Sequence, residues 1–365
     1  MTPITRRDFV KSAALAGAVA ATAGRLAEAA DEKKITLALA GCAHIHTPMF
    51  VNILKTRPDV NVKYVWDHDA ARAGKRAAEL GAKAVADAAA IWGDAEVTAV
   101  LIASETGRHA ELVTAAAKAK KHIFVEKPLA VGAKDSAETA AAVEKAGVLF
   151  TTGYVLRTVA QHIFIKENLA KGNFGKIVRA HCSFCNDCVL QGSFDDEWKW
   201  TVDAKCGALG GFADIGTHAL DMLMWLLGDV EAVSAELRSV TGRYAECDET
   251  GQATLRFKNG AAGTLSAGWV EPANPVGLLV SGTEGHAVMF NDRLYLRTKK
   301  VEGADGARPW GKLPAGPPHP LLQLLDAIGG QKDLPLVPAR EAAARVRVME
   351  AIYQAAREKK WVTLE

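Results

Sequence analysis

Three ionisable residues are spaced for one helix face within an otherwise apolar stretch of this 365-residue chain. Asp214, His218 and Asp221 stand at positions i, i+4 and i+7, so a helix would place all three on one side. A histidine with a carboxylate one turn away is a natural acid–base unit. A buried histidine that an aspartate satisfies for purely structural reasons would leave the same pattern, so both interpretations are open.

A lysine follows a short apolar stretch at the point where a parallel strand would end. Residues 122–125 are expected to form the strand, and Glu126, Lys127 and Pro128 come directly after it. Ligands bind beyond the carboxyl ends of the strands in parallel sheets. Lys127 could orient a substrate hydroxyl there and lower its pKa. A solvated lysine at a strand end is the simpler interpretation when this residue is taken alone.

A glycine turn lies between the first expected strand and the first expected helix. A dinucleotide-binding fingerprint would have glycine at positions 41, 43 and 46, whereas the chain has Gly41, Ala43 and His46. Ala43 still permits a fairly close approach of a pyrophosphate, but His46 does not reproduce the close helix–strand contact. Asp67 ends the second expected strand, where a carboxylate accepts from the ribose hydroxyls and repels a 2′-phosphate. The pattern predicts NAD rather than NADP, with an ordinary tight turn as the alternative.

The elements that would position these residues alternate along the first half of the chain. We expect strands over 34–40, 60–66, 98–103, 122–125 and 148–152, and helices over 47–56, 70–80, 108–120 and 135–146. Alternation at this spacing indicates βαβ units and a parallel sheet. The strands are apolar throughout, as expected when helices cover both faces. The sequence therefore predicts an α/β protein with an N-terminal Rossmann doubly wound domain over residues 33–152.

The second half has a different pattern. Strands with alternating polarity are expected over 176–183, 232–239, 251–257, 263–270 and 276–282, and a long helix over 340–358. Such alternation is typical of an antiparallel sheet with one wet face. We expect residues 153–365 to form an α+β domain with an open, mainly antiparallel sheet, and residues 303–320 to form a long loop.

The first 29 residues have the three parts of a signal peptide. Arg6 and Arg7 precede a short apolar run over 13–23, and residues 27–29 are a small-x-small cleavage site. The run is too short for a membrane span, which needs about 20 apolar residues, and paired arginines are typical of a twin-arginine signal. We expect a periplasmic protein that folds before export and has no membrane association after signal removal. A basic amphipathic arm is the alternative.

The charge balance argues against one class of partner. Residues 1–29 carry four Lys and Arg against two Asp and Glu, so they supply the whole formal net charge of +2. The remaining chain is near neutral. Binding to a phosphate backbone needs a basic excess, so we do not expect nucleic acid as a partner.

Cys182, Cys185 and Cys188 have a spacing that could hold zinc or part of an iron–sulfur cluster. In an extended strand, however, residues three apart point to opposite faces. We therefore expect no metal at these cysteines. A protein that folds before export must also be stable with reduced thiols, so few or no structural disulfides are expected.

Taken together, these motifs resemble the glucose–fructose oxidoreductase/inositol dehydrogenase (Gfo/Idh/MocA) family. The resemblance rests on Glu126-Lys127-Pro128 and on Asp214-x-Gly-x-His218-x-x-Asp221, and it extends over nearly the whole chain after residue 29. It implies an NAD cofactor, a sugar or cyclitol substrate, and an open sheet that often forms a homodimer or homotetramer. The chain departs from the family pattern at Ala43 and His46, and at Glu105 and Thr106, where Pro-Asn is usual.

The resemblance also implies the site residues. His218 would accept the proton of the reacting hydroxyl, Lys127 would hold that oxygen, and Asp214 would fix the imidazole. The cofactor would contact Gly41, Ala43, His44, Ile45, Asp67, Ser104, His109, Glu126 and Lys127. The sugar hydroxyls would contact Tyr154, Arg157, Trp200 and Asp221.

Export and redox chemistry constrain each other, because an exported enzyme cannot draw on a cytoplasmic pool of free NAD. The sequence therefore predicts an oxidoreductase that retains and recycles its cofactor while it acts on a sugar or cyclitol hydroxyl. A redox-neutral, NAD-dependent enzyme that cleaves glycosides would have the same fold. A protein of another class, a non-catalytic sugar-binding protein that has lost NAD, is favoured by the altered glycines and disfavoured by the aligned Lys127, Asp214 and His218.

Overall fold

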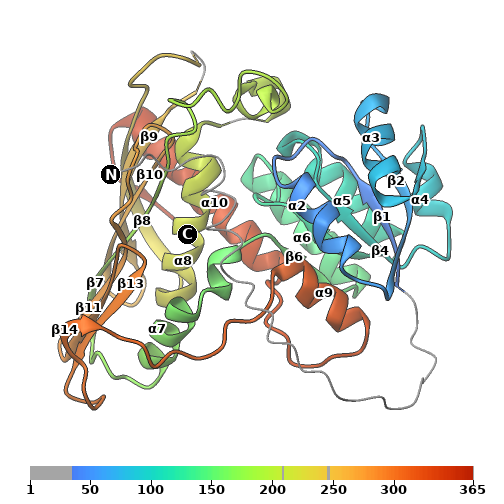
Figure 1. Ribbon diagram of the computed structural model, residues 1–365. Coiled ribbons are helices and arrows are strands. Elements are labelled where there is room, and N and C mark those ends of the chain that lie inside the picture. Colours follow the sequence, from blue (N-terminus) through green and yellow to red (C-terminus); the bar gives the residue numbers. More distant parts are fainter. Residues whose placement is uncertain (1–34, 208, 245–246, 365) are drawn as a thin grey trace, which may run out of the picture.

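The computed structural model describes residues 35–207, 209–244 and 247–364, so the signal expected over residues 1–29 lies outside the described part. Two sheets with helices between them make up the molecule (Figure 1). In the described ranges no helix is both long enough and apolar enough to cross a membrane.

The first sheet has six strands in the order β3-β2-β1-β4-β5-β6, and all its pairings are parallel. The strands are β1 (Ile35–Ala40), β2 (Val60–Trp66), β3 (Lys83–Ala84), β4 (Ala99–Ile102), β5 (His122–Val125) and β6 (Phe150–Thr152). The helices are α2 (Thr47–Lys55), α3 (Ala70–Leu80), α4 (Ala89–Gly93), α5 (His109–Lys118) and α6 (Ala133–Ala146), with a 3₁₀ turn η1 (Thr106–Arg108) before α5. This order confirms the Rossmann doubly wound sheet.

Local sequence explains where these helices begin and end. Asp69 caps α3 because its side chain accepts from the backbone N–H groups of Ala71 and Arg72. Gly81 ends the same helix in the left-handed region, at φ 64°, where a side chain would be strained. The central strands β1 and β4 are buried along nearly their whole length, which explains their continuous apolar sequence.

The second sheet has nine strands in the order β14-β13-β12-β11-β7-β10-β9-β8-β15. They are β7 (Ile177–Cys185), β8 (Val230–Arg238), β9 (Thr250–Phe257), β10 (Ala262–Gly268), β11 (Val276–Gly282), β12 (Gly285–Phe290), β13 (Arg293–Thr298), β14 (Asp305–Pro309) and β15 (Val362–Thr363). Only β7 and β10 pair in parallel among these described strands, so the sheet is mainly antiparallel, as predicted. Strand β14 lies inside the expected loop over 303–320, where its exposed, polar sequence gave no apolar alternation to detect.

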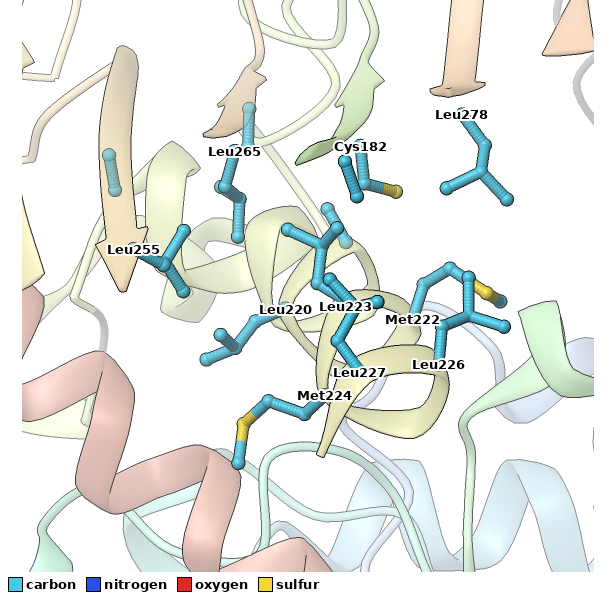
Figure 2. Close-up of a cluster of buried hydrophobic side chains, with 14 of the residues drawn as sticks. Cys182, Leu220, Met222, Leu223, Met224, Leu226, Leu227, Leu255, Leu265 and Leu278 are labelled. Atoms are coloured by element: carbon cyan, nitrogen blue, oxygen red, sulfur yellow. The ribbon is translucent and has the colours of Figure 1, made fainter. Parts of the chain in front are cut away.

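Two helices cover one face of the second sheet. Helix α8 (Gly211–Leu227) lies across β7 and β10, and helix α10 (Ala339–Glu358) lies beside β8 (Figure 1). Figure 2 shows Cys182, Leu265 and Leu278 of the sheet above the apolar side chains of α8. Nearly every residue of α8 is buried, so the helix is an interior element of this domain.

The end of the chain connects the two domains. Helix α9 (Pro320–Ile328) contributes Leu321, Leu324 and Leu325 to the core beneath β1. The first half of α10 packs Ala342 and Val346 into the core of the first domain, against α6. The second half of α10 belongs to the core of the second domain. One helix therefore holds both domains at their junction. Shorter elements complete the fold: α7 (Ala160–Ala170) and the 3₁₀ turns η2 (Val155–Thr158), η3 (Lys199–Val202) and η4 (Ala204–Cys206).

Candidate functional site

The centre of the site is a buried lysine that bridges the two domains. Lys127 follows β5 and is only 4% exposed. Its Nζ donates to the backbone oxygen of Asp214 at 2.8 Å and to Oδ1 of the same residue at 3.0 Å. Burial alone would raise the pKa of Asp214, but the neighbouring ammonium group outweighs it and lowers that pKa. Lys127 and Asp214 therefore form a charged pair across the domain junction, in which the lysine is buried and the aspartate is partly exposed.

His218 lies one helical turn after Asp214 and is almost completely buried. Burial, together with the charge of Lys127, lowers the pKa of His218 to about 3. Its Nδ1 is buried and has no hydrogen-bond partner among the described residues. The imidazole is therefore neutral at physiological pH and has an unused polar atom beside the charged pair, as a group that meets a ligand would have.

The role expected for Asp214 needs correction. We expected this carboxylate to fix the imidazole of His218. Its two oxygens instead accept from Lys127 Nζ and, at 3.2 Å, from the indole Nε1 of Trp269. Helical spacing places Asp214 and His218 on one face, but partners from other elements decide where the carboxylate points. Asp214 orients Lys127.

Side chains from distant strands and helices hold the start of α8 in place. Gly210 offers no capping side chain, and Asp248 accepts from the backbone N–H of Phe212 at 2.8 Å instead. The hydroxyl of Tyr353, on α10, donates to Asp248 at 2.6 Å and accepts from the N–H of Ala213. These contacts satisfy N–H groups that a helix start leaves free. They fix the first turn of α8, which carries Asp214.

The glycine turn is built for close packing. Gly41 has a φ of 88°, and a Cβ on it would lie 2.4 Å from the Cβ of Ser104, so no other residue fits there. The predicted cofactor residues Gly41 and Ser104 are therefore in contact with each other. The turn continues through Ala43 to His44, whose N–H donates to the carbonyl of Ala103 at 2.9 Å. Ile45 is half-buried at the start of α2.

Asp67 lies at the end of β2, where the sequence placed it. Its Oδ2 accepts from the backbone N–H of Cys42 at 2.6 Å, which ties it to the glycine turn. Its Oδ1 accepts from Arg72, and the same guanidinium donates to Glu105 at 2.7 Å. His68 also contacts Glu105, at 2.8 Å. Arg72 and His68 were not among the predicted cofactor residues, although both are within five residues of Asp67.

His44, His46 and Glu126 lie together at the carboxyl end of β5. His46 Nδ1 lies 2.9 Å from Glu126 Oε1, and His44 Nδ1 accepts from the backbone N–H of His46 at 3.2 Å. Burial lowers the pKa of His44 to about 3. Burial would raise the pKa of Glu126, but the two histidines outweigh it and hold that pKa well below its usual value. The position of the third glycine of the fingerprint thus holds a histidine bound to a buried carboxylate.

The segment over residues 186–207 covers the glycine turn. Trp200 Nε1 donates to the carbonyl of Ala43 at 2.8 Å, and the indole ring lies beside His44. Glu197 lies 3.4 Å from both Lys75 and Arg76 of α3. Trp200 was predicted to hold substrate, and the structure places it over the turn that is predicted to bind cofactor.

Two of the four predicted substrate residues, Arg157 and Asp221, bind each other. Arg157 donates to both oxygens of Asp221, at 2.9 and 2.6 Å, and to Glu341 at 2.8 Å. Arg345 adds a second guanidinium to Asp221 at 2.9 Å. Asp221 is thereby completely buried, and this ion-pair cluster ties α8 to α10 and η2. Its carboxylate is not directed at Lys127.

Tyr154 lies nearer the centre. Its ring is edge-on to His218, with the ring centroids 6.3 Å apart. Its hydroxyl lies 3.3 Å from Thr217 Oγ1. Phe184 approaches the same imidazole from β7, at 5.4 Å between centroids. Two aromatic rings therefore help to keep water from His218.

His109 lies between two loops that are predicted to contact the cofactor. Its side chain is completely buried, and its ring nitrogens face the carbonyls of Pro128, at 2.7 Å, and Ser104, at 3.2 Å. Burial lowers the pKa of His109, although the two carbonyls oppose this shift. His109 connects the loop after β4 to the loop that carries Lys127.

The three clustered cysteines do not converge. Cys182 points into the core above α8 (Figure 2), whereas Cys185 ends β7 beside Ser183. Cys42, Cys182, Cys185, Cys188 and Cys206 are free thiols. Within residues 35–207, 209–244 and 247–364, the group of metal-ligating side chains that does converge is His44, His46 and Glu126.

Two family models match the chain. Residues 35–154 match the model described as "Oxidoreductase family, NAD-binding Rossmann fold", and residues 162–288 match the "GFO/IDH/MocA C-terminal domain". The two matches correspond to the two domains of the fold and cover most of the chain between them.

Curated relatives are similar to this chain over only part of their own length. The 1,5-anhydro-D-fructose reductase of Ensifer adhaerens is 30% identical over 57% of this chain and 62% of its own length. The myo-inositol 2-dehydrogenase of Thermotoga maritima is 34% identical over 50% of this chain and 53% of its own. The chain thus spans between half and two thirds of these relatives.

Solved structures share the fold across nearly the whole molecule. The WlbA dehydrogenase of Bordetella pertussis, in complex with NADH and UDP-GlcNAcA, superposes with a TM-score of 0.79 at 23% identity, over 91% of this chain and 98% of that one. Levoglucosan dehydrogenase, in complex with NADH and levoglucosan, gives a TM-score of 0.77 at 21% identity, over 90% and 99%. On the two family models and the arrangement of both domains, the chain belongs to the Gfo/Idh/MocA oxidoreductase family, with an NAD-binding Rossmann domain.

Proposed function

We propose that this protein is an exported oxidoreductase that retains NAD and transfers a hydride between that cofactor and a carbon of a sugar or cyclitol. The observation that carries the proposal is the set of Lys127, Asp214 and His218 at the domain junction, in which Lys127 and His218 are buried. A protein that only bound a sugar would have no use for an enclosed ammonium group beside a neutral imidazole with a free nitrogen.

The geometry assigns a task to each side chain. Lys127 donates a hydrogen bond to the oxygen of the reacting hydroxyl and stabilises negative charge there, because Asp214 holds its Nζ in place. His218 accepts the hydroxyl proton on a nitrogen that burial keeps unprotonated. Tyr154 and Phe184 exclude water around the imidazole. NAD, when bound, supplies the hydride acceptor.

The residues around the glycine turn fit a dinucleotide. Gly41 permits the tight turn, and α2 begins directly after it, so the helix start can face a diphosphate. Asp67 lies at the ribose position that distinguishes NAD from NADP, and its carboxylate is oriented by Cys42 and Arg72.

The substrate class follows from the relatives. The names of the similar proteins describe a reductase of 1,5-anhydro-D-fructose and a dehydrogenase of myo-inositol, both of which act on polyhydroxylated rings. Export by the twin-arginine route is supported by residues 1–29. Folding around the cofactor before export would supply NAD to a compartment where none is free.

The test is to purify the protein, denature it and identify the released dinucleotide by mass. We expect NAD or NADH in near-stoichiometric amount. Absence of dinucleotide in protein that folded in the cytoplasm, together with no NAD binding on addition, would contradict the proposal.

A substrate panel separates the two chemistries of this fold. Turnover of free sugars or cyclitols with reduction of the cofactor supports the oxidoreductase. Release of an aglycone from glycosides without net reduction of the cofactor would replace it by the redox-neutral reaction. Lys127→Ala should abolish whichever activity is present, whereas the matched change Lys360→Ala, at an exposed C-terminal lysine, should leave it unchanged.

A further inference from the structure

A second arrangement of polar residues lies at the glycine turn, beside the proposed hydride-transfer site, and none of its side chains has a task in the proposed proton or hydride transfer. His44, His46 and Glu126 come from the glycine turn and from the end of β5, and each offers a ligand atom within 4.8 Å of the others. We propose that these three residues bind a divalent transition-metal ion, with zinc as the best fit.

The distances suit a metal after small adjustments. Nδ1 of His46 lies 2.9 Å from Oε1 of Glu126, and Nδ1 of His44 lies 3.9 Å from the same oxygen. Ligands on a tetrahedral zinc lie about 3.4 Å apart when the bonds are about 2.0–2.1 Å long. The two separations lie on either side of that value, so the two ring nitrogens and Oε1 must adjust their positions when an ion binds.

Neighbouring residues orient the carboxylate of Glu126 toward the two histidines. Oε2 of Glu126 accepts from the backbone N–H of Lys127 at 3.0 Å, which leaves Oε1 for the histidines. A Cβ at Gly153 would lie 2.8 Å from Oε2, so the glycine provides the space for the carboxylate. Such outer contacts orient a metal ligand and strengthen its binding.

The chemistry of the donor atoms also suits a metal. Imidazole nitrogens and a carboxylate oxygen are ordinary zinc ligands. The lone pair on Nδ1 of His44, which accepts from the backbone N–H of His46, would turn to the metal. Because Asp214 offsets the charge of Lys127, the carboxylate of Glu126 leaves a net negative charge for the ion.

Access to the site and its open coordination positions also support metal binding. The side chain of His46 is 31% exposed, whereas those of His44 and Glu126 are almost completely buried. An ion could therefore enter past His46. Three protein ligands leave at least one position open, as in zinc sites that bind water or a substrate oxygen.

The ligand types favour one class of ion. Two imidazoles and one carboxylate suit zinc, cobalt or iron(II), whereas magnesium and calcium prefer sites made wholly of oxygen atoms. Sequence reasoning missed this set because it searched for cysteine ligands and treated His46 as a replaced glycine. The signal was present as the His-x-His spacing of residues 44 and 46.

The test is a metal titration of the full chain, with no turnover involved, so its outcome is independent of the proposed function. Protein dialysed against a chelator is titrated with Co²⁺ and the visible absorption of bound cobalt is recorded. We expect one Co²⁺ per chain, displaced by one Zn²⁺ but not by Mg²⁺. Zinc content of protein grown with added zinc should approach one ion per chain.

Variants locate the site. His46→Gly restores the usual residue of the fingerprint and should preserve folding, and Glu126→Gln keeps the size of the side chain. Each should weaken Co²⁺ binding at least 10-fold, whereas His181→Ala, on the second sheet, should bind as the wild type. Circular dichroism checks folding. No stoichiometric binding in the wild type, or unchanged binding in folded His46→Gly and Glu126→Gln proteins, would overturn the proposal.

Discussion

At the scale of single residues, the proposed hydride transfer depends on how one lysine is held. Lys127 is buried, and Asp214 receives its ammonium group through both a backbone and a side-chain oxygen. Trp269 in turn holds the second carboxylate oxygen. A chain of contacts from the second sheet therefore positions a cation that belongs to the first sheet, and the site is complete only when the domains are docked.

Lys127→Ala should lower kcat by about 100- to 10,000-fold, the usual range for loss of a group that assists proton transfer. Asp214→Asn should have a smaller effect, because the amide still accepts from Lys127 but no longer carries charge. Steady-state kinetics on the best substrate of the panel measure both. Equal activity of Lys127→Ala and the wild type would remove Lys127 from the site.

We predict that Asp67 sets the preference for NAD and that Arg72 would attract a 2′-phosphate if Asp67 were replaced. Asp67→Ser would remove the carboxylate that repels a 2′-phosphate and free a guanidinium that attracts one. We expect the ratio of NAD to NADP affinity to fall at least 10-fold. Binding of both dinucleotides, followed by intrinsic fluorescence, measures the ratio. Asp69→Ser is the matched control, since Asp69 caps α3 and Ser keeps the cap. A ratio that does not change in Asp67→Ser would contradict this role.

Motif spacing singled out the three residues that are proposed as catalytic, but it did not predict their partners. Lys127, Asp214 and His218 are recognisable because polar residues stand out at the end of an apolar strand and along an apolar helix. Trp269 and Tyr353 contribute through contacts over long sequence separations, and such residues carry no local signal. The position of Asp221 between two arginines was hidden for the same reason.

At the scale of elements, we expect the segment over residues 186–207 to affect how long a cofactor stays bound. The contact of Trp200 with the carbonyl of Ala43 joins the segment to the glycine turn. The altered fingerprint has lost two glycines, and we predict that this segment provides a different means of retention. Retention matters because the proposed enzyme must keep its NAD after export.

Trp200→Ala should speed dissociation of NAD about 10-fold, because one hydrogen bond of about 1 kcal/mol and the ring contact with His44 are lost. Trp200→Phe keeps the ring and should have a smaller effect. Dissociation is measured by exchange of bound NAD for labelled NAD. The change Trp361→Ala, at an exposed residue of the second domain, serves as a control. A rate in Trp200→Ala equal to that of the control would show that the segment does not retain the cofactor.

The strands of the first sheet could be predicted closely because they are short, continuous apolar stretches. The predicted range 60–66 agrees with β2, and 122–125 agrees with β5. Prediction was weaker in the second sheet, where β14 is short and exposed. Edge strands depend on pairing with a neighbour, and their own sequence does not identify them.

At the scale of the whole molecule, buried histidines connect the fold to pH. Burial lowers the pKa of His44 and His218 to about 3 and that of His319 to about 4. The unfolded chain binds these protons near pH 6.5. Below that pH the unfolded state binds more protons than the folded state. The contribution of these histidines to the free energy of unfolding is therefore fully present above about pH 6.5, and it is lost as the pH falls toward 3.

His319 allows this to be tested at a histidine that has no assigned task in hydride transfer. Its ring caps α9 by accepting from the N–H of Leu321, and Asn can make the same cap. His319→Asn should reduce the loss of stability between pH 6.5 and 4 by at most about 3 kcal/mol, at 1.36 kcal/mol per pKa unit. Urea unfolding at several pH values measures the loss. The same pH dependence in variant and wild type would contradict a lowered pKa at His319.

The return of α9 and the first half of α10 to the first domain was not predicted. Their apolar faces are compatible with any helix–sheet contact, and only the assembled cores show which sheet they cover. Helix α10 consequently contributes to both cores. It also carries Glu341 and Arg345, which complete the ion-pair cluster around Asp221.

The most direct test of the account is a single-turnover measurement on protein purified with its own cofactor and no added NAD. Mixing it with the panel of sugars and cyclitols should convert bound NAD to NADH, seen as NADH absorbance of no more than one equivalent per chain. Lys127→Ala protein with the same cofactor content should show no such signal. Protein that carries NAD but never reduces it with any ring alcohol, nor oxidises added NADH with any ring ketone, would contradict the proposed oxidoreductase.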